Sequence, residues 1–69
     1  MATINDALAE MLDALGYTRM SQIARKEKSK EHRRAYARMI VRELKRRKQY
    51  SNAASAERKF KRLEQLGEL

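Results

Sequence analysis

The sequence predicts an all-α protein, a small domain of three or four helices. The chain of 69 residues contains no Pro and only two Gly, so few residues would interrupt a helix. Residues that favour helices, such as Ala, Leu, Lys and Arg, dominate the composition, and no long stretch alternates apolar and polar residues as a strand would. From apolar spacing and capping residues we expect helices near residues 4–15, 18–28, 30–49 and 53–66.

The first predicted helix, residues 4–15, carries one wide apolar stripe. Thr3 and Asp6 have the spacing of a capping box, and Gly16 stands where a left-handed residue would end the helix. The stripe residues expected to pack in the core or in a dimer are Ile4, Leu8, Met11, Leu12 and Leu15. A core of this size rarely supplies more than about 3–5 kcal/mol, so we expect a homodimer to complete it.

The segments that follow leave the number of helices open. Residues 18–28 begin as a short amphipathic helix and end in a run of charged residues. Ser29 is a candidate N-cap for the helix over 30–49, with one continuous helix from Thr18 onward as the alternative. Ser51 and Asn52 are candidate N-caps for the last helix, which either follows a turn or is fused to the preceding one.

The helix expected over residues 30–49 has a cationic arc opposite its apolar side. This arc consists of Arg34, Arg38, Arg42, Lys45 and Arg46, and only Glu31 shares it, at the helix start. Glu43 lies near the apolar stripe instead and is expected to pair with Arg47. The cationic surface continues on the last helix, so the predicted binding residues are Arg34, Arg38, Arg42, Lys45, Arg46, Arg58, Lys61 and Arg62.

Charge divides this single domain of residues 1–69 into two parts. The 17 Lys and Arg outnumber the nine Asp and Glu, which gives a net charge of +8. Residues 1–18 hold three acids and no base, so all the basic residues lie beyond them. We therefore expect an acidic amphipathic assembly helix over residues 1–16 and a basic helical body over residues 17–69.

The basic body predicts a nucleic-acid-binding protein with a regulatory or architectural role. Clustered Arg and Lys gain affinity by releasing the counterions condensed on phosphates, and Arg on a helix can read base edges in the major groove. Double-stranded DNA is therefore favoured over RNA as the partner. The alternative is a small interaction module or inhibitor that binds an acidic surface of a partner protein. The single sign of the arc argues against a surface that only confers solubility.

Other classes of function find little support in the residues. The chain has no Cys and one His, so no metal site is expected. It shows no glycine-rich phosphate loop and no nucleophile–base pair, so we expect no enzymatic activity and no cofactor. No apolar run approaches the length of about 20 residues that a membrane-spanning helix needs. We expect a soluble, cytoplasmic protein.

Overall fold

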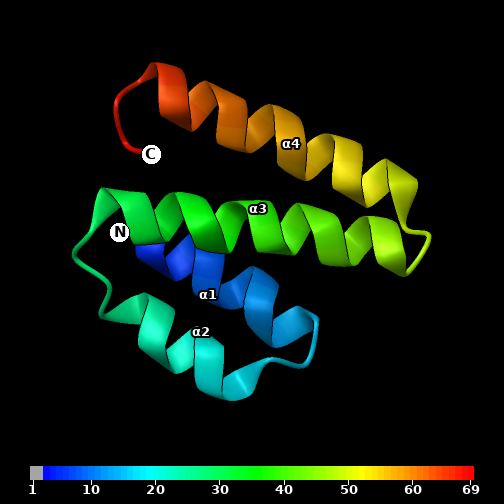
Figure 1. Ribbon diagram of the computed structural model, residues 1–69, viewed down its shortest axis with the longest axis horizontal. Helices are drawn as coiled ribbons and strands as arrows, with labels where there is room; N and C mark the ends of the chain where they lie inside the picture. The colour runs from blue at the N-terminus through cyan, green and yellow to red at the C-terminus, as the bar shows by residue number, and fades with distance from the viewer. Residues whose placement is uncertain (1–2) are drawn as a thin grey trace.

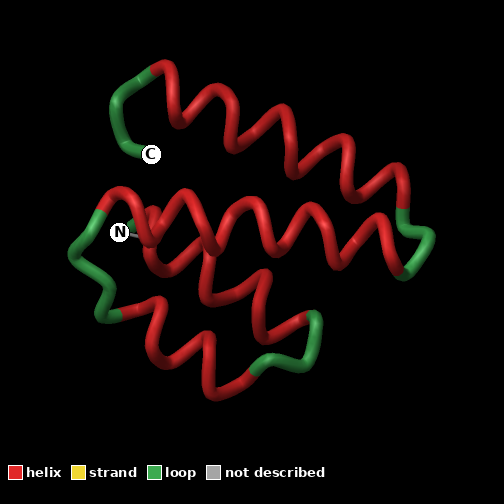
Figure 2. Tube along the Cα trace, in the orientation of Figure 1, coloured by secondary structure: helices red, strands yellow, loops and turns green. Residues whose placement is uncertain are grey.

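The structure, a computed structural model, describes residues 3–69. Four helices follow one another along the chain: α1 (Ile4–Ala14), α2 (Thr18–Arg25), α3 (Lys30–Arg46) and α4 (Tyr50–Gln65). These residues contain no strand (Figure 2). The predicted all-α class is therefore confirmed, with four helices rather than three.

The helices pack as two pairs, joined by a contact between α1 and α3. α1 packs mainly against α2, and α3 packs against α4. Figure 1 shows α3 in the middle of the molecule, with α4 on one side and α1 and α2 on the other. The acidic first helix packs mainly against α2, and it meets α4 through side chains of the common core.

Both ends of α1 are held by the caps that the sequence predicts. The Thr3 hydroxyl accepts a hydrogen bond from the Asp6 amide, and the Asp6 carboxylate accepts one from the Thr3 amide, each at 3.2 Å. At the other end Gly16 has φ +94°, and the amides of Gly16 and Tyr17 each donate to carbonyls of the last turn at 2.9 Å. This Schellman arrangement satisfies those carbonyls and turns the chain into α2.

The end of α2 differs from the prediction. The helix stops at Arg25 rather than 28, because hydrogen bonds hold the following segment in a non-helical shape. The Glu27 carboxylate accepts from the Ser29 amide at 3.1 Å, and the Asn5 side chain donates to the carbonyl of Glu27. The Ser29 hydroxyl then caps α3, as predicted, by accepting from the His32 amide at 3.4 Å. A helix that runs unbroken from α2 into α3 is therefore excluded.

A tight turn separates α3 from α4. α3 ends at Arg46 rather than 49, and Lys48 adopts the left-handed conformation with φ +63°. The amides of Lys48 and Gln49 donate back to carbonyls of the last turn at 3.0 and 2.9 Å, which is the arrangement that Gly16 makes after α1. The chain reverses within these residues, so α3 and α4 are two helices and not one rod.

The predicted N-caps of α4, Ser51 and Asn52, are wrong. The N-cap is Gln49, and both predicted residues lie inside the first turn, because the left-handed residue before Gln49 has already redirected the chain. α4 therefore begins at residue 50 instead of 53. It ends at Gln65, one residue before the predicted end, and Gly67 with φ +81° closes it.

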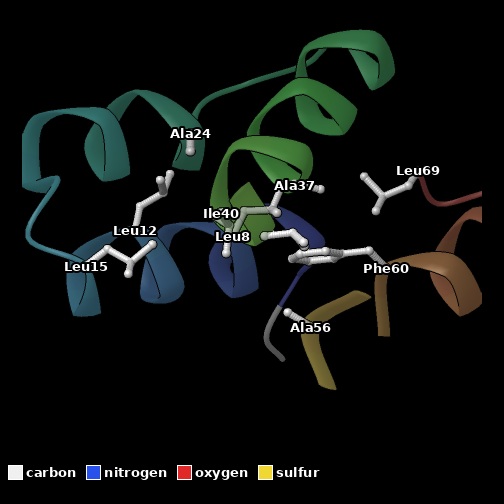
Figure 3. Packing of buried hydrophobic residues seen from close by; sticks show 10 residues of the cluster. Leu8, Leu12, Leu15, Ala24, Ala37, Ile40, Ala56, Phe60 and Leu69 are labelled. Carbon is white, nitrogen blue, oxygen red and sulfur yellow. The ribbon is translucent and has the colours of Figure 1, made fainter. Parts of the chain in front are cut away.

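One apolar core connects the helices. Leu8 and Leu12 of α1 and Ile40 of α3 are completely buried, and Figure 3 shows Phe60 of α4 reaching the same cluster. Leu69 folds back from beyond α4 and joins it. Each such side chain stabilises the fold by about 1.5–3 kcal/mol through the apolar surface it removes from water.

The apolar stripe of α1 lies inside a single chain. Leu8, Leu12 and Leu15 are buried, and Ile4 and Met11 pack against the core from its edge. The chain's own helices cover the stripe, so it does not need a second copy to bury it. A homodimer stays a prediction, but this stripe no longer supplies its reason.

Candidate nucleic-acid interface

The eight predicted binding residues all lie on α3 and α4, which run antiparallel side by side (Figure 1). Five come from α3 and three from α4. The partners of the eight side chains decide which of them can meet a ligand.

Five of the eight are exposed and form no ion pair within residues 3–69. These five, called here the open cations, are Arg38, Arg42, Arg58, Lys61 and Arg62. Arg38 and Arg42 are one turn apart on α3, and Arg58 and Arg62 are one turn apart on α4, so each pair spans about 6 Å along its helix axis. Exposed charges without a carboxylate partner are the ones that a polyanion can bind.

Lys45 and Arg46 already have carboxylate partners. The Lys45 Nζ atom lies 3.1 Å from Oε1 of Glu57 on α4, so this ion pair links the two helices. The Arg46 guanidinium binds both carboxylate oxygens of Glu43 on its own helix. A phosphate would have to compete with these carboxylates.

Arg34 is partly buried and holds the end of the chain. Its Nη2 atom donates to the main-chain carbonyl of Leu69 at 3.0 Å, which fixes the residues after α4 against α3. Its Nε atom is buried and has no hydrogen-bond partner in the described part of the chain. The Arg34 guanidinium is therefore already engaged within the chain, and its predicted role in binding stays a prediction.

A groove of about 280 Å³ lies between α3 and α4. Arg38 of α3 and Lys61 of α4 both line it, so the fold brings these two predicted residues to one place. The groove also has an apolar part, to which Val41 and Phe60 contribute. A ligand in this groove would meet cations at the rim and apolar side chains below them.

Two acidic residues lie among the cations of this groove. Glu57 and Glu64 of α4 line the same groove as Arg38. The helical arrangement of charges on α3 alone is cationic, but the neighbouring helix adds carboxylates beside it. This could not be predicted from the sequence, because helical periodicity assigns a residue to a side of its own helix and does not show which helix lies beside it.

Glu43 and Arg47 form the ion pair that the sequence predicts. The Arg47 Nε atom lies 3.0 Å from Glu43 Oε1, and Arg47 Nη2 donates to the carbonyl of Leu15, the C-cap of α1, at 2.7 Å. The guanidinium also lies 6.0 Å from the centre of the Tyr17 ring. Hydrogen bonds from Arg46 and Arg47 lower the pKa of Glu43 from 4.5 to about 2. The carboxylate is thus ionised at neutral pH and keeps Arg47 in place.

Two carboxylates of α1 form ion pairs with α2. Asp6 and Asp13 pair with Arg25 at 3.1 and 3.8 Å. Hydrogen bonds with the Thr3 amide and with Arg25 lower the pKa of Asp6. Two of the three carboxylates of α1 therefore share one cation of α2, the helix that lies on the side of the molecule away from α4 (Figure 1).

Six further cations are exposed and unpaired within the described residues, although the sequence did not single them out. They are Arg19, Lys26, Lys28, Lys30, Lys48 and Lys59. The positive field therefore extends beyond α3 and α4. Lys30 and Lys59 belong to α3 and α4 as well, whereas Arg19, Lys26, Lys28 and Lys48 lie outside these two helices.

The structure also bears on sites of other kinds. Residues 3–69 contain no group of three or more His, Asp or Glu side chains placed to hold a metal ion. The Nδ1 atom of His32 lies 3.1 Å from Glu27 Oε1, so this residue belongs to the junction of α2 and α3. None of the helices in this part of the chain is long and apolar enough to cross a membrane.

Comparison of the chain with protein-family models, curated proteins and solved structures gave no match. No relative therefore assigns a role to any of these side chains.

Proposed function

We propose that this protein binds nucleic acid, with duplex DNA as the favoured partner, through the open cations of α3 and α4. The observation that carries the proposal is their placement: five exposed cations without ion-pair partners in residues 3–69, on two adjacent antiparallel helices. The net charge of +8 adds a long-range attraction for any polyanion. The proposed role is regulatory or architectural.

The binding energy would come from phosphates. Each phosphate that a cation neutralises releases condensed counterions, and log K then falls with log salt at about 0.9 per contact on duplex DNA. Five contacts predict a slope of about −4.5. Four of the five open cations are Arg, whose planar guanidinium binds phosphate oxygens in pairs.

The shape of α3 favours duplex DNA over duplex RNA. The helix has 17 residues and is about 25 Å long, so it can lie in the wide major groove of B-DNA. The major groove of RNA is too deep and narrow for side chains to read. With α3 at the groove, α4 and its two aligned Arg residues would follow the neighbouring phosphates.

A salt titration with three ligands tests this proposal. Fluorescence anisotropy would measure the affinity for matched duplex DNA, duplex RNA and single-stranded DNA at several salt concentrations. We expect the highest affinity for duplex DNA and a slope between about −4 and −5. A slope near zero, or no binding at low salt, would contradict the proposal.

The second candidate function is binding to an acidic surface of a partner protein. The observation that favours it is the apolar part of the groove that Arg38 and Lys61 line. Val41 and Phe60 contribute to this part, and a phosphate group would gain nothing from contact with apolar side chains. Both functions would use the Lys61 charge, so a variant of this residue does not separate them. The titration above does: absence of binding to all three nucleic acids at low salt would favour the acidic partner surface.

A further inference from the structure

A second cavity, of about 300 Å³, opens between the end of α1, α3 and the first half of α4. Its lining is mainly apolar: Met11 and Leu15 from α1, Ile40 and Leu44 from α3, and Ala56 from α4. No residue lines both this cavity and the groove that contains Arg38. It is therefore a separate feature of the fold, and the open cations do not contribute to it.

The polar residues at this cavity are hydrogen-bond donors and one cation. Lys59 lines it, and no other charged residue among residues 3–69 does so. Lys59 is exposed and forms no ion pair in that part of the chain. The Asn52 side chain donates a hydrogen bond to Gln49 Oε1 at 3.0 Å. That oxygen is therefore occupied, and the side-chain NH₂ group of Gln49 is left to donate to a ligand. The Ser55 hydroxyl completes the polar side.

We propose that this cavity binds a small molecule with an apolar body and a carboxylate head, in the manner of a medium-chain fatty acid. The apolar lining would take the hydrocarbon chain, and Lys59, Gln49 and Ser55 would bind the carboxylate. This arrangement has the general form of a ligand site, in which apolar walls supply affinity and a few polar groups fix the orientation.

The size of the cavity sets the size of the ligand. A closed apolar cavity of about 150 Å³ accommodates one benzene ring. The cavity here has about 300 Å³, so it has room for a chain of about eight carbons, with the head at the open side. An anionic head also suits a protein of net charge +8, whereas a second copy of the chain would bring the same positive charge.

Octanoate is the probe for the test. Titration of the ¹⁵N-labelled protein, followed by amide chemical shifts, would compare octanoate with octanol and with octyltrimethylammonium, which share its chain and differ in the head. We expect saturable shifts centred on α1 residues near Leu15 and on the first half of α4, with octanoate the tightest binder. Equal affinity for all three ligands, or shifts spread over the whole surface, would overturn the proposal.

Two lysines of α4 provide a matched pair of variants. Lys59 lines this cavity, and Lys61, two residues on, lines the other groove. Lys59→Gln should weaken octanoate binding by about two- to fivefold, the size expected for an exposed ion pair, and Lys61→Gln should not. An equal loss in both variants would mean that octanoate responds only to net charge.

A third variant tests the apolar part independently of charge. Ala14 lines the cavity and is exposed, so Ala14→Leu would fill space there without disturbing a buried position. We expect this variant to keep the helical circular dichroism of the wild type and to lose the octanoate shifts. Unchanged octanoate binding in folded Ala14→Leu would show that the cavity is not the site. The proposal does not rest on nucleic-acid binding, and either can fail alone.

Discussion

The Arg47 guanidinium donates a 2.7 Å hydrogen bond to the main-chain carbonyl of Leu15, a residue 32 positions earlier in the chain. This contact joins the end of α3 to the end of α1. Helix C-termini leave carbonyls without partners, and a cation there is also favoured by the helix dipole. The contact therefore links the α1–α2 pair to the α3–α4 pair.

Arg47→Ala should lower the free energy of unfolding by about 1.5–3 kcal/mol, because it removes a charged donor from a main-chain carbonyl. Arg46→Ala is the matched control, since Arg46 binds the same Glu43 carboxylate and makes no bond to Leu15. Urea unfolding would measure both. Equal losses in the two variants would show that the Leu15 contact contributes nothing of its own.

The pH dependence of stability should contain a component from Glu43. Its pKa is lowered from 4.5 in the unfolded chain to about 2 in the folded protein. The carboxylate therefore stabilises the fold fully above about pH 4.5, and this contribution is lost as the pH falls towards 2. Glu43→Gln should be less stable at pH 7 and should lose less stability on acidification through this range. Glu10→Gln, an exposed change outside the ion pairs of residues 3–69, should follow the wild type.

Lys48→Gly should stabilise the protein. Lys48 has φ +63°, a conformation that costs a residue with a Cβ atom roughly 1–2 kcal/mol and costs Gly little. Part of this gain is offset by the greater freedom of Gly in the unfolded chain, so we expect a rise of about 1 kcal/mol, or about 4–8 °C in Tm. Lys48→Ala keeps the Cβ atom and should show no such rise. A lower Tm in the Gly variant would contradict the left-handed turn.

Leu8→Asp should unfold the chain instead of dissociating a dimer. Leu8 is completely buried in the core of one chain, and an unpaired carboxylate cannot be accommodated there. Leu8→Met, which keeps the volume, should remain folded. Circular dichroism and sedimentation of both variants would decide. A folded monomeric Leu8→Asp protein would mean that α1 packs on another chain.

The helix termini show which parts of the fold could be predicted from the sequence. Thr3, Gly16 and Ser29 cap as predicted, because their capping chemistry depends only on residues close by in the chain. Lys48 makes the same left-handed turn as Gly16, but it is not a Gly, the residue type from which such a turn is predicted. The predicted end of α3 and the predicted start of α4 were therefore both misplaced. Caps that rest on characteristic residue types could be predicted, and a left-handed turn at a Lys could not.

The candidate interface on α3 and α4 was likewise only partly predictable from the sequence. Helical periodicity places Arg38 and Arg42 on an exposed side of α3, and they are exposed. It could not show that Glu57 would come from α4 to pair with Lys45, or that Leu69 would fold back onto Arg34. These contacts depend on which helices are neighbours, and a single-helix pattern does not contain that information.

The proposed function attributes DNA binding to the open cations and not to the net charge. Arg38→Ala/Arg42→Ala and Arg19→Ala/Lys26→Ala each remove two exposed cations that form no ion pair within residues 3–69, from α3 in the first case and from α2 and its C-cap in the second. The direct measurement is the salt dependence of duplex DNA affinity for both double variants beside the wild type. We predict that the α3 variant loses about two units of log–log slope, one for each phosphate contact, and binds more weakly, while the α2 variant keeps a slope close to that of the wild type. Equal slopes and affinities in the two variants would contradict the claim.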